Sequence, residues 1–119
     1  MLVCVDLDGT ISAFPQEIGA LMSGLMAQGH EVHILTGHKA ESASPEVARE
    51  KIALVKSLGC ENNWDKLVLV ANPKNKVAKA KVAYMRHAGA SVLIDNDKHN
   101  VKAASKAGFM ALRPHRKTK

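Results

Sequence analysis

Short apolar runs alternate with stretches of helical periodicity along the whole chain. The runs are continuously apolar, as in parallel strands that are covered on both faces, and they lie at residues 2–5, 32–35, 67–70, 92–94 and 109–112. Between them, apolar residues recur every three or four positions, which predicts amphipathic helices. We expect these helices from residue 15 to a stop at 29, from 45 to a stop at 59, from about 74 to 88, and from 101 to 107.

This alternation, with its short connections, predicts βα units and right-handed crossovers. The expected fold is an α/β three-layer sandwich around a five-stranded, parallel, Rossmann-like sheet. The chain has 119 residues, 46% of them hydrophobic, which is enough for one domain. We place that domain at residues 1–112, followed by a basic tail at 113–119. Only four residues separate Thr10 from the helix-opening Pro15, so we expect no cap domain there and an open site.

The amino-acid composition limits the cellular compartment and the binding partners that we expect. No apolar run approaches the roughly 18 residues of a membrane span, so we expect no membrane partner. Cys4 and Cys60 fit neither a disulfide framework nor a zinc motif, which favours the cytoplasm. The net charge of +6 suggests an anionic partner such as a nucleic acid. With 3% aromatic residues, recognition by base stacking is disfavoured.

Polar residues follow three of the predicted strands at the point where each strand ends. They are residues 6–10 (Asp-Leu-Asp-Gly-Thr), 36–38 (Thr-Gly-His) and 95–97 (Asp-Asn-Asp). Ligands of open α/β sheets bind beyond the carboxyl ends of the strands, so these segments predict one site. Asp6 and Asp8 can lean toward the same side of the rim, and their repulsion calls for a cation. Oxygen ligands alone favour Mg²⁺.

This series of motifs resembles the haloacid dehalogenase superfamily of phosphohydrolases. Residues 6–10 match its first motif, DxDGT. Residues 34–37 (Ile-Leu-Thr-Gly) match its second motif, and residues 93–95 (Leu-Ile-Asp) match the strand and first acid of its fourth motif. The resemblance covers most of the chain, from Val3 to about Leu112. It implies a small phosphatase without a cap domain that hydrolyses a phosphomonoester.

The resemblance also implies roles for individual residues. Asp6 would be the nucleophile that forms an aspartyl-phosphate, and Asp8 would protonate the leaving group and then activate water. Mg²⁺ would be held by Asp6, the backbone carbonyl of Asp8, and Asp95. The phosphate would be bound by Asp8, Gly9, Thr36, Gly37 and a lysine. Thr36 and that lysine would complete the catalytic set.

The identity of the lysine is open, because Lys74, Lys76, Lys79 and Lys81 all lie near the start of the third helix. Lys81 borders the apolar side of that helix, whereas Lys79 lies on a polar face. We therefore choose Lys81, with Lys76 as the second candidate. The fourth motif departs from the family's usual pattern, because Asn96 follows the first acid and the second acid falls at Asp97.

Two other interpretations of these motifs compete with a phosphatase. A receiver domain carries its phosphoacceptor after the third strand, and the third strand here ends in Ala71-Asn72-Pro73, without an acid. The remaining alternative is a catalytically inactive, basic binding module for nucleic acid or a phosphorylated ligand on the same scaffold. The expected partner is a phosphorylated substrate, with nucleic-acid ends among the candidates. An open site could also be closed by a second subunit of a homo-oligomer.

Overall fold

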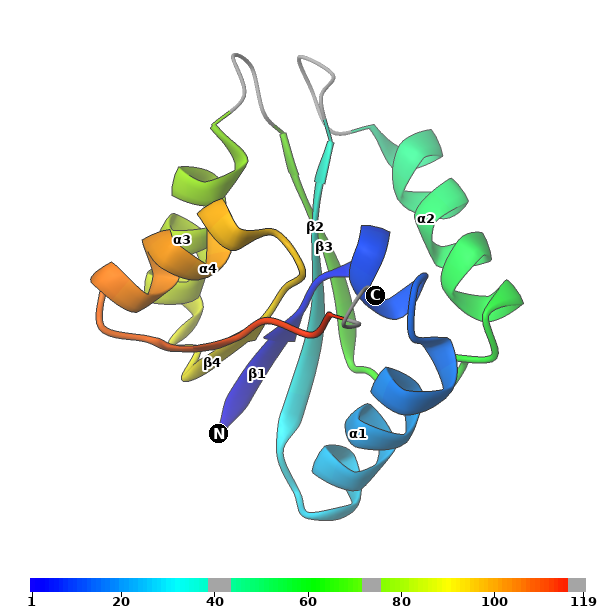
Figure 1. The fold of residues 1–119 in the computed structure, drawn as a ribbon. Helices are drawn as coiled ribbons and strands as arrows, with labels where there is room; N and C mark the ends of the chain where they lie inside the picture. The colour runs from blue at the N-terminus through cyan, green and yellow to red at the C-terminus, as the bar shows by residue number, and fades with distance from the viewer. Residues whose placement is uncertain (39–43, 72–75, 116–119) are drawn as a thin grey trace, which may run out of the picture.

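The computed structural model describes residues 1–38, 44–71 and 76–115. Within these ranges, the five strands form one parallel sheet in the order β3-β2-β1-β4-β5 (Figure 1). The strands are β1 (Leu2–Val5), β2 (Glu31–His38), β3 (Lys66–Ala71), β4 (Val92–Ile94) and β5 (Met110–Leu112). The helices are α1 (Pro15–Ala27), α2 (Pro45–Ser57), α3 (Val77–Ala88) and α4 (Lys98–Lys106), with a wide turn, η1 (Leu7–Ile11), after β1. The predicted five-stranded parallel α/β fold is confirmed.

The helices cover the sheet from both sides, so each strand contributes side chains to two cores. On one face, Val3 and Val5 pack with Met22 of α1 and Val55 of α2. On the opposite face, a second buried cluster contains Leu2, Cys4, Leu35, Met85, Leu93 and Ala104, from three strands and from α3 and α4. Figure 1 shows the same division, with α1 and α2 on one side of the sheet and α3 and α4 on the other. Alternate residues of β1 therefore pack into the two cores on opposite faces of the sheet.

Strand order places a topological switch point beside β1. The chain passes from β1 to β2 and β3 on one side, then crosses to β4 and β5 on the other side. The connections after β1 and β4 therefore diverge at the carboxyl edge of the sheet. That divergence opens a crevice at the position where ligands of such sheets bind.

The starts of helices α4 and α3 can be compared with the sequence prediction. Helix α4 begins at Lys98 rather than at residue 101, because the Asp97 carboxylate accepts from the backbone N–H groups of His99 and Asn100 and caps the helix. Helix α3 begins at Val77 within the described part. The predicted start at Lys74 lies outside the described residues.

Among the described residues, none of the helices combines the length and apolarity that crossing a bilayer requires.

The N-cap of helix α2 can be tested by mutation. Its N-terminus is capped by Ser44, whose Oγ accepts from the Val47 N–H at 3.2 Å. Ser44→Ala should lower the free energy of unfolding by about 1 kcal/mol, because one N-terminal N–H loses its acceptor. Ser44→Asp retains an acceptor and should stay within about 0.5 kcal/mol of the wild type. Urea denaturation followed by circular dichroism measures both, and equal stability of all three proteins would show that the cap contributes nothing.

Candidate functional site

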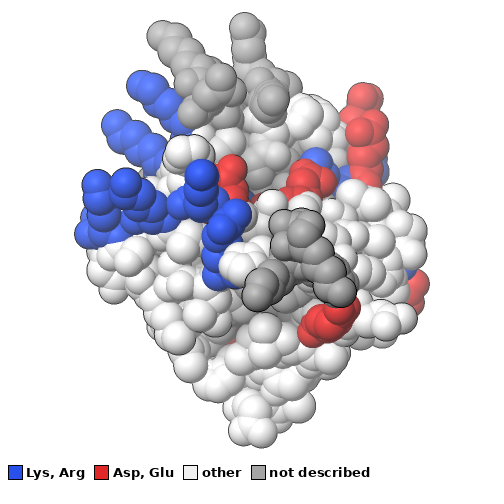
Figure 2. All heavy atoms as spheres, in the orientation of Figure 1, with Lys and Arg blue, Asp and Glu red and all other residues white. Residues whose placement is uncertain are grey.

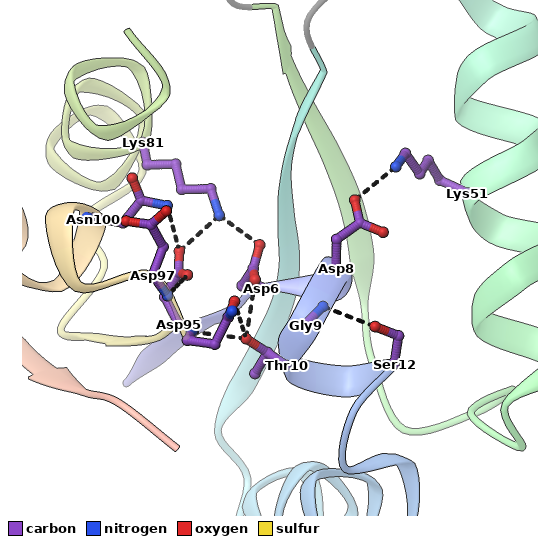
Figure 3. A network of polar contacts seen from close by, with 11 residues as sticks. Asp6, Asp8, Gly9, Thr10, Ser12, Lys51, Lys81, Asp95, Asp97 and Asn100 are labelled. Atoms are coloured by element: carbon purple, nitrogen blue, oxygen red, sulfur yellow. Dashed lines mark hydrogen bonds and ion pairs between the residues drawn. The ribbon is translucent and has the colours of Figure 1, made fainter. Parts of the chain in front are cut away.

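A cavity of about 300 Å³ lies at the carboxyl edge of the sheet, at the switch point. Asp6 follows β1 and Asp95 follows β4, so the fold brings these two carboxylates to its centre (Figure 3). Both are buried. The cavity is lined by residues of four segments: Asp6, Asp8, Thr36, Gly37, Val77, Lys81, Asp95, Asn96, Asp97 and Asn100.

The side chain of Lys81 joins the two carboxylates. Its Nζ lies 2.7 Å from Asp6 Oδ1 and 2.8 Å from Asp95 Oδ2, and its side chain is 1% exposed. Helix α3 supplies this lysine from the second face of the sheet, and Figure 3 shows it reaching between the strand ends. Two of its three N–H groups are therefore occupied by these ion pairs, and the third meets no acceptor recorded among the described residues.

The charges in this cluster alter the proton affinity of its members. Burial raises the pKa of Asp6 from its ordinary value of 3.8 to about 6, and Lys81 opposes that shift. For Lys81, burial alone would lower the pKa, but Asp6 and Asp95 together raise it above its ordinary value. Lys81 therefore remains charged at neutral pH. The buried trio then carries one net negative charge.

The carboxylate of Asp95 is held from several directions. Its Oδ1 accepts from the Asp97 N–H at 2.9 Å, and its Oδ2 accepts from Asn100 Nδ2 at 3.0 Å. With its amide nitrogen facing Asp6, the Asn96 side chain donates to Asp6 Oδ2 and to the backbone carbonyl of Asp8, each at 3.0 Å. Asn96 thus stabilises the Asp6 carboxylate, whereas a second acid at position 96 would repel it. The carboxylate of Asp97 is used as the cap of α4.

The side chain of Asp8 does not join Asp6. It turns toward α2, where its Oδ2 lies 2.8 Å from Lys51 Nζ, and it is 57% exposed (Figure 3). Asp6 and Asp8 both line the cavity, but the Asp8 carboxylate pairs with Lys51 and not with the buried cluster around Asp6. Sequence reasoning missed Lys51. Its signal was a lysine on the same helical stripe as the apolar Val47 and Leu54.

Thr36 and Gly37 form the β2 wall of the cavity. Thr36 is 1% exposed, and its hydroxyl has no hydrogen-bond partner among the described residues. A side chain at Gly37 would collide with α3, because its Cβ would lie 2.8 Å from Val77 Cγ1. Gly9 has a φ of +81°, and its Cβ would lie 2.5 Å from the side-chain amide of Asn96. Both glycines therefore let the segments around the cavity approach closely.

Among the described lysines named from the sequence, only Lys81 lines this cavity. Lys76 and Lys79 are exposed, and Lys74 lies outside the described residues. Helical periodicity alone separated Lys81 from Lys79, because the two positions lie on different faces of α3.

Within residues 1–38, 44–71 and 76–115, no three His, Cys, Asp or Glu side chains form a group that could hold a metal ion by themselves. The geometry explains this, because Asp8 is turned toward Lys51 and the amine of Lys81 lies between Asp6 and Asp95. Burial raises the pKa of Cys4 to about 12, so its thiol is unreactive.

Comparison with known proteins gives matches to solved structures only. No protein-family model and no curated protein sequence matches the chain. A universal stress protein in complex with cAMP has a TM-score of 0.61 at 16% identity, covering 97% of this chain and 96% of that one. A protein of the universal stress protein family from Burkholderia pseudomallei has a TM-score of 0.60 at 15% identity, with 95% and 94% covered. An uncharacterized protein from Corynebacterium glutamicum has a TM-score of 0.63 at 18% identity, with 97% and 85% covered.

These comparisons correct the family prediction. The neighbours with a named family are universal stress proteins, so the assignment to the haloacid dehalogenase superfamily is wrong. The predictions of a phosphatase, a hydrolase class and an aspartyl-phosphate intermediate depended on it and are wrong as well. The physical reason is that polar residues after parallel strands indicate the carboxyl edge of a sheet, which unrelated α/β families use for different chemistry. At these identities the likeness shows the fold.

The ion-pair cluster predicts a large effect of Lys81. Lys81→Met should lower the free energy of unfolding at pH 7 by about 3–5 kcal/mol, because it leaves two buried carboxylates without their cation. Lys79→Met removes an exposed lysine from the same helix and should change stability by less than about 0.5 kcal/mol. Lowering the pH to 5 should restore part of the lost stability, because Asp6, whose pKa is raised to about 6, can then be protonated. Equal urea midpoints for the two variants would contradict this arrangement.

The raised pKa of Asp6 predicts a pH dependence of its own. Asp6 binds a proton more readily in the folded protein than in the unfolded chain, where its pKa is 3.8. Its contribution to stability is therefore full below about pH 3.8 and is lost as the pH rises through about 6. Relative to Asp6→Asn, the wild type should lose about 2–3 kcal/mol between pH 4 and pH 7, measured by urea denaturation with EDTA. Parallel pH profiles for the two proteins would contradict the shift.

Proposed function

We propose that this protein binds a phosphorylated small molecule, together with Mg²⁺, in the cavity between the carboxyl ends of β1, β2 and β4. The observation that carries the proposal is the hydroxyl of Thr36. It is buried, lacks a partner among the described residues and lines a cavity that also contains the ammonium group of Lys81. A buried donor without an acceptor is unfavourable in the free protein, and a phosphate oxygen would satisfy it.

The charge of the cavity supports a role for a cation. Asp6 and Asp95 outweigh Lys81 by one negative charge, so an anionic phosphate would be repelled if it entered alone. Mg²⁺ usually binds through one or two carboxylates, several waters and the phosphate of its ligand, and does not require a cage of protein side chains. Asp6 and Asp95 would be those two carboxylates, and the Lys81 ammonium that lies between them in the free protein would share them with the ion. The ion would supply positive charge at the phosphate.

The remaining contacts would come from the β2 wall and α3. Lys81 has one N–H group beyond its two ion pairs, and the Thr36 hydroxyl can donate to a phosphate oxygen. Gly37, near the end of β2, has no side chain that would cover its backbone in the cavity.

A nucleotide is the class of ligand that the comparisons favour. One of the similar structures is described as a universal stress protein in complex with cAMP, which is a nucleoside phosphate. The proposal for this chain is therefore a nucleotide-binding domain, and binding without turnover is the activity to be measured.

Isothermal titration calorimetry with AMP, cAMP, ADP and ATP, each with Mg²⁺ or with EDTA, tests the proposal. We expect at least one nucleotide to bind with Mg²⁺ and to bind at least about tenfold more weakly with EDTA. Thr36→Val should weaken binding about tenfold or more, because a hydrogen bond to a charged group contributes about 1.5–3 kcal/mol. Thr36→Ser keeps the hydroxyl and should bind within about threefold of the wild type.

The free protein provides a second measurement on the same variants. Thr36→Val replaces a buried, unpartnered hydroxyl by a methyl group, so it should unfold at equal or higher urea concentration than the wild type. A variant that loses binding and keeps its stability identifies Thr36 as a ligand contact. Absence of nucleotide binding in both buffers would contradict the proposal, and steady release of inorganic phosphate would contradict binding without turnover.

A further inference from the structure

The exposed Lys and Arg side chains of helices α3 and α4 form a basic flank of the molecule. Helices α3 and α4 contain no Asp or Glu, and their exposed cationic residues are Lys79, Arg86, Lys98, Lys102 and Lys106. Figure 2 shows Lys and Arg gathered on this flank, over α3 and α4. The net charge of +6 is thus distributed unevenly, which is typical of a surface that meets an anionic partner.

A groove of about 450 Å³ runs between these two helices on the same flank. Its lining alternates small apolar side chains with long basic ones: Ala78, Lys79, Val82 and Arg86 from α3, and Ala103, Lys106 and Ala107 from α4 and its C-cap. The short alanine side chains form the floor of the groove, and the three cationic side chains surround it. We call this surface the α3–α4 groove.

The α3–α4 groove is separate from the phosphorylated-ligand site. Lys81 and Val77 line the cavity at the sheet edge, whereas Ala78, Lys79 and Val82 line the groove, so helix α3 presents two faces to two different surroundings. Binding of a partner in the groove would therefore not depend on the proposed nucleotide binding in the cavity.

We propose that the α3–α4 groove binds an acidic amphipathic helix of a partner protein. An apolar floor between two helices accepts the apolar side chains of a third helix at positions i, i+3, i+4 and i+7. The surrounding Lys79, Arg86 and Lys106 then pair with acidic residues on either side of that apolar stripe.

The floor of the groove distinguishes this partner from a nucleic acid. Phosphates would meet the same cations, but a duplex has no apolar stripe to place against Ala78, Val82 and Ala103. Single strands bind through aromatic stacking, and the lining of the groove contains no aromatic residue among those described. Helix α3 has 12 residues and is about 18 Å long, which matches about three turns of a docked helix.

Fluorescence anisotropy with two labelled 16-residue peptides tests the proposal on the full chain. One peptide has leucines at i, i+3, i+4, i+7 and i+11 with glutamates around them. The other has the same composition in an order without an apolar stripe. We expect the amphipathic peptide to bind at least about tenfold more tightly than its rearranged control, because only its leucines can enter the groove. A 20-base-pair DNA duplex forms the third arm.

Matched charge reversals locate the binding surface. Lys79→Glu and Arg86→Glu lie in the groove and together should weaken the amphipathic peptide at least about tenfold. Lys102→Glu reverses an exposed lysine of α4 that does not line the groove, and should change affinity by less than about threefold. Ala78→Gln adds bulk to the floor without changing charge, and should weaken the amphipathic peptide while leaving the rearranged one unchanged.

The possible results separate the proposal from its rivals. Tighter binding of the amphipathic peptide, lost in the groove variants and kept in Lys102→Glu, supports the helix-binding groove. Equal binding of both peptides, or tighter binding of the duplex, overturns it in favour of unspecific attraction or nucleic-acid binding. Absence of binding by either peptide also overturns it. Circular dichroism and urea denaturation of each variant show that its fold is retained.

Discussion

The ammonium group of Lys81 determines whether the carboxyl edge of this sheet can exist in its present form. It lies within 2.8 Å of two buried carboxylates that come from different strands, while its own backbone belongs to a helix on one face of the sheet. Two carboxylates in such a place repel each other and lose their hydration. Their shared cation offsets both effects. It also ties the ends of β1 and β4 to α3 at the switch point.

The same arrangement sets the character of the cavity. Because one lysine serves two acids, the cluster keeps a net negative charge, and the Thr36 hydroxyl beside it has no partner among the described residues. Positive charge gathers instead on the outer side of α3 and on α4. Helix α3 therefore separates an acidic cavity from a basic surface, and residues only one to three positions apart in sequence belong to different electrostatic environments.

Several parts of the site could be predicted from the sequence, because they follow from local rules. Parallel strands end at one edge, so Asp6, Thr36 and Asp95 were expected together, and helical periodicity favoured Lys81 over Lys79. The family assignment went wrong at the next step. A short motif such as residues 6–10 specifies a strand, a tight turn and two acids, and this pattern alone does not identify one family. The solved structures that resemble the whole fold include universal stress proteins, at 15–16% identity, and this likeness shows the fold alone.

The sequence by itself determined the elements, the parallel sheet and the edge at which polar residues collect, because hydrophobic period and chain order act locally or through simple connection rules. Tertiary structure decided the direction of each polar side chain. Asp8 turns to Lys51, which is 43 positions away in the chain, and Asn96, after β4, approaches Asp6 and Gly9, after the neighbouring strand β1. The groove between α3 and α4 likewise exists only once the two helices pack. Such contacts depend on distances between segments remote in sequence, and no local pattern encodes those distances.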